Sequence, residues 1–191
     1  MTPFVSLTAL AQEKVAKALE NGALAIDATV GNGHDTLFLA GRVGRQGHVI
    51  GFDIQARALE GARSRLRATG LESNTTLHLC GHEHMLEKVP TGWRGKVCAV
   101  MFNLGYLPGG EKNLTTGPAT TIGALDQAVS LLKPKGLISL LVYRGHPGAR
   151  SEADAVLTWL DRLNGGFEHT RHESPGPVLH LIQRLGGYSR R

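Results

Sequence analysis

The chain has 191 residues, of which 41% are hydrophobic and 19% charged, and its 21 basic and 16 acidic residues give a formal net charge of +5. This composition is typical of a globular protein, so residues 1–191 are predicted to fold as a single domain around a sizeable core, and the charge is compatible with an RNA partner without indicating one. No apolar stretch approaches the length of a membrane span and the N-terminus lacks a signal-peptide pattern, which argues against a membrane protein and makes the cytoplasm the expected compartment.

Helix and strand patterns alternate along the chain. The opening segment predicts an amphipathic helix, because apolar side chains recur at helical spacing at Leu7, Ala11, Val15, Ala18 and Leu19. Strands are then predicted at about 24–27, 49–52, 76–79, 97–102 and 137–143, with helical segments between them. The helix before the fifth strand carries an apolar stripe at Ile122, Leu125, Val129 and Leu132, and the turn 133–136 should end it.

The C-terminal part predicts one more helix and a hairpin. Ser151 and Asp154 resemble a capping box that opens a helix with Val156 and Leu157 facing inward. Predicted strands at 167–171 and 178–184 are too close in sequence for a crossover helix, so they should pair as an antiparallel hairpin. Strands linked by helices and closed by a hairpin predict an α/β fold with a mostly parallel sheet and helices on both faces. Cys80 and Cys98 lie in apolar strand patterns and are expected to be reduced core residues.

A glycine turn follows the first predicted strand. Gly31 and Gly33 let the backbone approach a ligand closely and adopt positive φ angles. About 20 residues after Gly33, the second strand ends in Asp53, whose carboxylate is placed to accept hydrogen bonds from a ribose diol. The turn and the acidic strand end together predict a cofactor that contains adenosine.

The residues around this turn favour S-adenosylmethionine over a nicotinamide dinucleotide. A dinucleotide site has a third glycine three residues after Gly33, where this chain has Thr36. Asp27 and Asp35 add negative charges that repel a pyrophosphate but suit the ammonium group of a methionine moiety. Alternatively, Asp35 caps the following helix and stabilises its positive end, and the two roles are compatible.

Polar residues also follow the other predicted strands. The third strand is followed by 80–83, the fourth by Asn103-Leu104-Gly105-Tyr106-Leu107-Pro108, and the fifth by 143–146. Because ligands bind at the carboxyl ends of parallel strands, these segments should converge on one site. An amide, free carbonyls and an aromatic face suit a planar base or an amine beside a cofactor, although the fourth segment could also be an ordinary strand-exit turn. His82 and His84 form a poor zinc signature, so no metal is predicted.

Taken together, these segments resemble a family of small class I methyltransferases labelled putative rRNA methylase, which includes bacterial tRNA 5-aminomethyl-2-thiouridine methyltransferase. The likeness is carried by residues 27–36, 51–55, 82–84, 102–109 and 143–146, and it spans the chain from the first helix to Arg184. The segment Glu173-Ser174-Pro175-Gly176-Pro177 departs from the Asn-rich approach to the last strand that the family leads us to expect.

The resemblance implies a Rossmann-like class I methyltransferase fold with seven strands, the last antiparallel, and S-adenosyl-L-methionine as cofactor. It also implies N-methylation of 5-aminomethyl-(2-thio)uridine at the tRNA wobble position. The candidate catalytic residues are Asn103 to orient the amine, Tyr106 to stack on the base and His146 to accept a proton. The candidate cofactor-binding residues are Asp27, Gly31, Asn32, Gly33, Asp35, Thr36, Asp53, Ile54, Gln55, Gly81, His82 and Asn103. The candidate substrate-binding residues are Leu104, Gly105, Tyr106, Pro108, Tyr143 and Arg144.

Other interpretations stay open. The protein could methylate rRNA or a small molecule, could be a nicotinamide-dependent oxidoreductase, or could be a non-catalytic RNA-binding domain. Four arginines on one predicted helix form either a solvated face or a contact to RNA phosphates: Arg57, Arg63, Arg65 and Arg67. The segment 109–117 is predicted to be a loop over the site, or plain surface. We expect tRNA as the partner, without membrane or metal, and leave a homodimer open.

Overall fold

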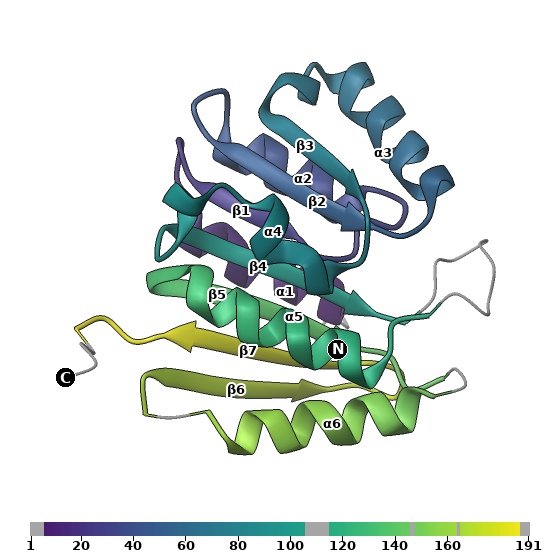
Figure 1. The fold of residues 1–191 in the computed structure, drawn as a ribbon, viewed down its shortest axis with the longest axis vertical. Helices are drawn as coiled ribbons and strands as arrows, with labels where there is room; N and C mark the ends of the chain where they lie inside the picture. The colour runs from purple at the N-terminus through teal and green to yellow at the C-terminus, as the bar shows by residue number, and fades with distance from the viewer. Residues whose placement is uncertain (1–5, 106–114, 146–147, 164, 188–191) are drawn as a thin grey trace, which may run out of the picture.

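The protein is described by a computed structural model that covers residues 6–105, 115–145, 148–163 and 165–187. Within these residues the chain forms one seven-stranded sheet flanked by helices (Figure 1). The strands are β1 Leu24–Asp27, β2 His48–Asp53, β3 Thr75–Leu79, β4 Val97–Leu104, β5 Leu132–Val142, β6 Phe167–Glu173 and β7 Val178–Arg184. The α-helices are α1 Leu7–Ala18, α2 His34–Val43, α3 Ala56–Thr69, α4 Met85–Lys88, α5 Pro118–Leu131 and α6 Ala149–Asp161.

The order of strands in the sheet is β3-β2-β1-β4-β5-β7-β6. The strands from β3 to β5 pair in parallel. β7 runs antiparallel to both of its neighbours, β5 and β6. The predicted α/β fold, its mostly parallel sheet and its C-terminal hairpin are therefore confirmed, as is the antiparallel last strand that the family resemblance implied.

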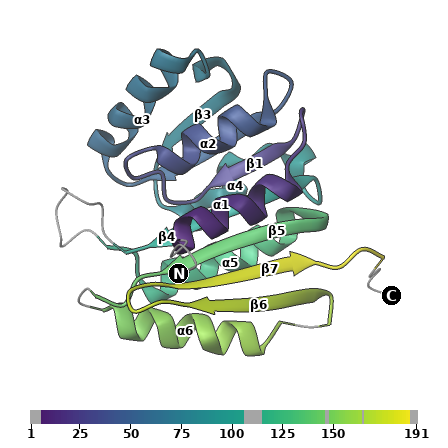
Figure 2. The same cartoon turned by 180° about the vertical axis from the view of Figure 1, so that it is seen from behind.

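Helices cover both faces of the sheet. Figure 1 shows α4, α5 and α6 in front of the sheet, and Figure 2 shows α1, α2 and α3 from behind. On the first side Leu125, Leu131 and Val156 join the buried apolar cluster of the sheet. On the second side Val15 and Leu39 belong to a separate buried cluster. The two clusters pack the helices against both faces of the sheet. This packing holds the carboxyl ends of the parallel strands in place at one edge of the sheet.

Two predicted strand boundaries were wrong. β4 was expected to end at residue 102, but it continues to Leu104 because Asn103 and Leu104 pair with Leu141 and Val142 of β5. β5 was expected to begin at residue 137, but it begins at Leu132, and the Lys-Pro-Lys-Gly turn lies inside it beside a register shift. Asn103 is thus held inside a strand pair and is more rigid than a residue in a loop.

The predicted capping box was also wrong. α6 begins at Ala149 after Gly148, which has a φ of 82° in the left-handed region that glycine tolerates. Ser151 therefore lies within the first turn of the helix. The side chains that face the core include Glu152 and Val156, whereas Leu157 is 38% exposed. The inward position of Glu152 places a carboxylate in the buried face of α6.

No helix in the described part of the chain combines the length and the apolar character needed to cross a membrane. Cys80 and Cys98 are both free thiols. Cys98 is buried as predicted, whereas the predicted core position was wrong for Cys80, which follows β3 and is only partly buried.

Candidate active site

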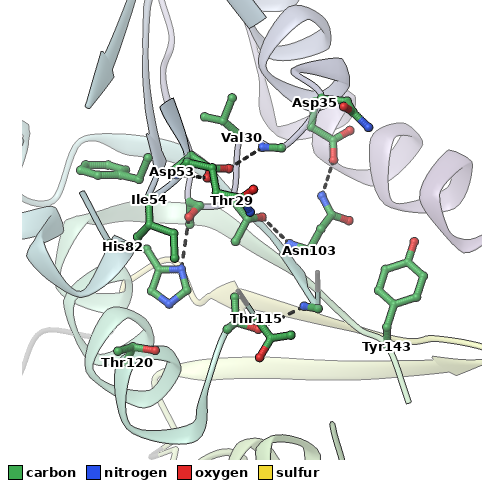
Figure 3. A pocket seen from close by; sticks show the side chains of 18 of the residues that line it. Thr29, Val30, Asp35, Asp53, Ile54, His82, Asn103, Thr115, Thr120 and Tyr143 are labelled. Atoms are coloured by element: carbon green, nitrogen blue, oxygen red, sulfur yellow. Dashed lines mark hydrogen bonds between the residues drawn. The ribbon is translucent and has the colours of Figure 1, made fainter. Parts of the chain in front are cut away.

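A cavity of about 510 Å³ opens at the carboxyl ends of the parallel strands (Figure 3). Residues that follow β1, β2, β3, β4 and β5 all line it, together with Thr8 from α1 and Thr120 from α5. The cavity lies where the strand order reverses between β1 and β4, which is the usual place for a ligand in an open α/β sheet. The five predicted strand ends are therefore brought together at one edge.

Asp27 supports the loop after β1 from inside the protein. It is fully buried, its Oδ1 accepts a hydrogen bond from the backbone N–H of Thr29 at 3.1 Å, and its Oδ2 accepts from Oγ1 of Thr36 at 2.6 Å. Burial and the neighbouring charge of Asp35 raise the pKa of Asp27 to about 7. Asp27 and Thr36 thus hold the turn to the start of α2, and neither is among the residues that line the cavity.

Gly33 is required by packing between two helices. Its φ is 77°, and a side chain at this position would meet Cβ of Ala62 in α3 at 2.7 Å. Gly33 does not line the cavity, whereas Gly31, with a φ of 50°, does. Of the two glycines predicted to approach a ligand, Gly31 is therefore the one that the structure places beside the cavity.

Asp53 connects the ends of β1 and β2. Its Oδ2 accepts a hydrogen bond from the backbone N–H of Gly31 at 2.8 Å, and its Oδ1 accepts from that of Gln55 at 2.8 Å. Each carboxylate oxygen has two lone pairs, so both oxygens can accept a further hydrogen bond from a ligand. The adjacent Ile54 lines the cavity and is 52% exposed, which offers an apolar surface to a flat ring. This pair suits a ribose diol and a base beside it.

His82 presents an unpaired acceptor in the cavity wall. Its Nδ1 lies 3.2 Å from the carbonyl oxygen of Ala28, and because a carbonyl can only accept, this nitrogen carries the proton. Burial lowers the pKa of His82, so the ring is neutral and its Nε2 has a lone pair. This buried Nε2 has no hydrogen-bond partner among the described residues. A buried acceptor of this kind suits the N–H donor of a bound ligand.

Asn103 is fixed by contacts from two sides. Its backbone N–H donates to Oγ1 of Thr29 at 2.7 Å, and its Nδ2 donates to Oδ2 of Asp35 at 2.6 Å. The other oxygen of Asp35 accepts from Nε2 of Gln12 in α1 at 2.7 Å. Since the amide nitrogen of Asn103 is engaged, its oxygen is the group that remains for an N–H donor of a ligand. Figure 3 shows the Asn103 side chain between Asp35 and Tyr143.

The predicted site residues fall into three groups. Those that line the cavity are Gly31, Asn32, Asp35, Asp53, Ile54, Gln55, Gly81, His82, Asn103, Gly105 and Tyr143. Those in the described structure that are not among the lining residues are Asp27, Gly33, Thr36, Leu104 and Arg144. Tyr106, Pro108 and His146 lie outside the described residues, as does most of the predicted loop 109–117.

Several lining or supporting residues were not predicted. Thr29 lies inside the glycine turn, two residues after Asp27. A hydroxyl at this place in a ligand-binding turn could have been selected from the sequence as a candidate site residue. Gln12 reaches Asp35 from α1, 23 residues away in sequence, and no local pattern marks it. Thr116 and Thr120 also line the cavity, although Thr116 falls within the predicted loop over the site. Hydroxyl and amide residues such as these are too common in sequences to be selected without the fold.

The predicted basic residues make local contacts. Nε of Arg65 donates to the carbonyl oxygen of Asn32 at 2.9 Å, next to the cavity. Arg67 pairs with Glu72, and Arg144 pairs with Glu173 at 3.5 Å. No group of three or more His, Cys, Asp or Glu within the described ranges is arranged to hold a metal ion.

The strand order, with β7 antiparallel between β5 and β6, and the cavity at the strand ends define the Rossmann-like class I methyltransferase fold. Residues 49–174 match the family described as "Putative rRNA methylase", and the chain belongs to this family. Family membership confirms the resemblance that the sequence motifs carried.

Individual relatives agree with this placement. The chain is 44% identical over 149 residues to the chloroplastic tRNA (mnm(5)s(2)U34)-methyltransferase of Arabidopsis thaliana, a match that covers 73% of this chain and 53% of the relative. The chain therefore spans about half the length of this curated relative. A crystal structure of a putative rRNA-methylase from Clostridium thermocellum is similar with 35% identity and a TM-score of 0.90, covering 97% of this chain and 100% of that one. A putative methyltransferase from Streptococcus mutans, in complex with SAH, has 31% identity and a TM-score of 0.84, with 95% and 99% of the two chains covered.

Proposed function

We propose that this protein is an S-adenosylmethionine-dependent tRNA methyltransferase that N-methylates 5-aminomethyl-(2-thio)uridine at the wobble position. The observation that carries the proposal is the Asn103 amide, whose nitrogen is engaged with Asp35 while its oxygen is left for an amine at the end of β4. The name of the Arabidopsis relative supports the same nucleoside, and the SAH in the Streptococcus mutans relative supports the cofactor.

The cavity residues fit S-adenosylmethionine. Asp53 would accept hydrogen bonds from the ribose hydroxyls, Ile54 would pack on the adenine, and Nε2 of His82 would accept from an adenine N–H. Asp35 would attract the positive charge of the methionine part. S-adenosylmethionine supplies an electrophilic methyl group on a sulfonium sulfur.

The protein's own task is to orient the acceptor amine. An in-line displacement needs alignment more than a strong base, and the Asn103 oxygen accepting an amine N–H would direct the nitrogen lone pair towards the methyl group. An alkylamine is mostly protonated at neutral pH, so the site must bind the neutral form or accept a proton from it. His146 is the proposed proton acceptor, and Tyr106 and Tyr143 are the proposed stacking partners of the base.

Family membership argues against two of the alternatives. A nicotinamide-dependent oxidoreductase and a non-catalytic RNA-binding domain both disagree with a chain that belongs to a methylase family. An rRNA substrate is the second candidate, because the family description names rRNA whereas the Arabidopsis relative is named for tRNA. A small-molecule acceptor is tested by the same experiment.

We propose tRNA as the partner and the cytoplasm as the compartment, where the free thiols Cys80 and Cys98 would stay reduced. The Arabidopsis relative is named as chloroplastic, so the compartment is a property to be measured.

The test has two steps. Calorimetry should give tight binding of S-adenosylmethionine and no comparable binding of NADH. Mass spectrometry of nucleosides from a deletion strain should then show the aminomethyl precursor accumulating in tRNA, with rRNA unchanged. Normal methylaminomethyl-thiouridine in a strain without a redundant enzyme would overturn the tRNA assignment, and a methyl group missing from rRNA would select the second candidate.

A further inference from the structure

Glu152 is a buried carboxylate on α6 that the proposed chemistry does not use. It is 1% exposed, its Oε1 accepts a hydrogen bond from Oγ1 of Thr121 at 2.6 Å, and its Oε2 accepts from Oγ1 of Thr116 at 2.9 Å. Within the described ranges no cation pairs with it. The charge of Glu152 also acts on the buried ring of His82, whose pKa is lowered by burial. Burying a carboxylate among neutral groups is costly, so its position calls for a reason other than packing.

One of the two hydroxyls belongs to the cavity wall. Oγ1 of Thr116 accepts a hydrogen bond from the backbone N–H of Gly105 at 3.1 Å, and the backbone N–H of Thr116 donates to the carbonyl oxygen of Gly105 at 3.2 Å. Gly105 and Thr116 both line the cavity. Because the Thr116 proton points to Glu152, the Thr116 oxygen keeps its lone pairs for Gly105. Glu152 thus orients a hydroxyl that holds the end of β4.

We propose that Glu152 is a positioning residue for methyl transfer: through Thr116 it holds Gly105, and with it the strand end on which Asn103 faces the acceptor. This inference rests on the proposed function. Glu152 acts from behind the cavity wall and does not touch the reactants, so it contributes to the alignment of the acceptor and leaves cofactor binding to other residues. Misplacement of reacting groups by about 1 Å can cost about 100-fold in rate.

Glu152 accepts one hydrogen bond from the cavity wall and one from a neighbouring helix, so its positioning role can be tested separately from its role in helix packing. Thr121 is fully buried within α5 and is not among the lining residues, so its bond ties α6 to α5. A second tie between the same helices lies nearby, where Nε1 of Trp159 donates to Asp126 at 2.7 Å. Of these contacts, only the one to Thr116 involves a residue that lines the cavity. Asp126→Ala removes an α5–α6 hydrogen bond without changing a lining residue, so it is a matched control.

The experiment compares Glu152→Gln, Thr116→Val, Thr116→Ser and Asp126→Ala in the full chain. A glutamine side chain accepts through one oxygen only and presents an amide N–H to the other hydroxyl, so one of the two hydroxyls loses the acceptor for its proton. The measurements are the unfolding midpoint, the Kd for S-adenosylmethionine, kcat and KM with tRNA, and amide hydrogen exchange at Gly105.

Glu152→Gln and Thr116→Val are expected to lower kcat by about 10- to 100-fold, to change the cofactor Kd by less than about twofold, and to speed exchange at Gly105. Thr116→Ser keeps the hydroxyl, so it should keep both kcat and the slow amide hydrogen exchange of Gly105 near their wild-type values. Asp126→Ala should lower the unfolding midpoint while kcat and the exchange of Gly105 stay at wild-type values.

Equal loss of kcat in Asp126→Ala would assign Glu152 to helix packing and overturn the inference. Unchanged exchange at Gly105 in both Glu152→Gln and Thr116→Val would overturn it whatever the substrate proves to be. If the wild-type protein binds the cofactor but methylates no tRNA, the proposed function fails, and the exchange comparison still decides whether Glu152 holds the strand end.

Discussion

Asp27 makes the stability of this protein depend on pH in a way that one substitution should remove. The carboxyl group is fully buried, and burial raises its pKa from 3.8 to about 7. The folded state therefore holds the proton more tightly than the unfolded state. As the pH rises from about 4 to above 7, the unfolded state releases its proton first, and the folded state must either keep its proton or bury a charge. The free energy of unfolding therefore falls.

The size of this effect follows from the shift in pKa. One pKa unit corresponds to about 1.4 kcal/mol, so Asp27 should lower the free energy of unfolding by about 2–3 kcal/mol between pH 5 and pH 8. The side chain introduced by Asp27→Asn would be neutral at every pH. Its amide oxygen can accept from the backbone N–H of Thr29 and its amide nitrogen can donate to Oγ1 of Thr36, so both hydrogen bonds have a replacement.

The assay is urea unfolding of the wild-type protein and of Asp27→Asn at pH 5, 6, 7 and 8. Titrating groups distant from Asp27 contribute equally to both proteins, so the difference between them reports Asp27 together with its coupling to the charge of Asp35. We expect Asp27→Asn to gain stability relative to the wild type as the pH rises, with most of the change complete by pH 8. Parallel pH dependences of the two proteins would refute the assignment of a raised pKa to Asp27.

Three further predictions concern the proposed reaction. Asp53→Ala should weaken binding of S-adenosylmethionine by about 1.5–3 kcal/mol, the range for hydrogen bonds to a charged group, with a smaller effect on folding; an unchanged Kd in a folded variant would remove Asp53 from the ribose site. Asn103→Ala should keep the cofactor bound and lose methyl transfer, because its oxygen is proposed to orient the amine, and near wild-type turnover with tRNA would contradict this. The rate of transfer should rise with pH as the bound amine loses its proton, since the neutral amine is the reactive form; a flat profile with chemistry rate-limiting would count against an amine acceptor.

The fold was predictable because its signals are local. Apolar runs and helical stripes alternate along the chain, and the short spacing before β7 left only an antiparallel pairing with β6. Strand boundaries were less predictable. β4 continues through Asn103 because Leu141 of β5 is available to pair with it, and that partner is supplied by a strand nearly 40 residues further along the chain.

The candidate site also contains residues that were predictable from the local sequence and residues whose roles depend on packing. Gly31 and Asp53 were recognisable from the sequence, because the turn and the strand tip have a characteristic spacing, and Asp53 accepts the Gly31 N–H at 2.8 Å. Asp27 and Asp35 are both carboxylates close to the glycine turn in sequence, so the sequence did not distinguish their roles. Asp27 is fully buried and supports the turn from inside, whereas Asp35 lines the cavity. Which of two nearby carboxylates faces a ligand depends on how the turn packs against α2.

The sequence by itself determined the succession of helices and strands along the chain and the residues at the strand ends, because each depends on patterns within a few residues. The methyltransferase arrangement of the sheet was implied by the resemblance to the methylase family. Only the tertiary structure decided the partners of those residues. Gln12 reaches Asp35 from α1, and Glu152 reaches Thr116 from α6, 36 residues away. A hydrogen bond requires two groups to meet within about 3 Å, and the packing of distant helices on a sheet is what brings them there.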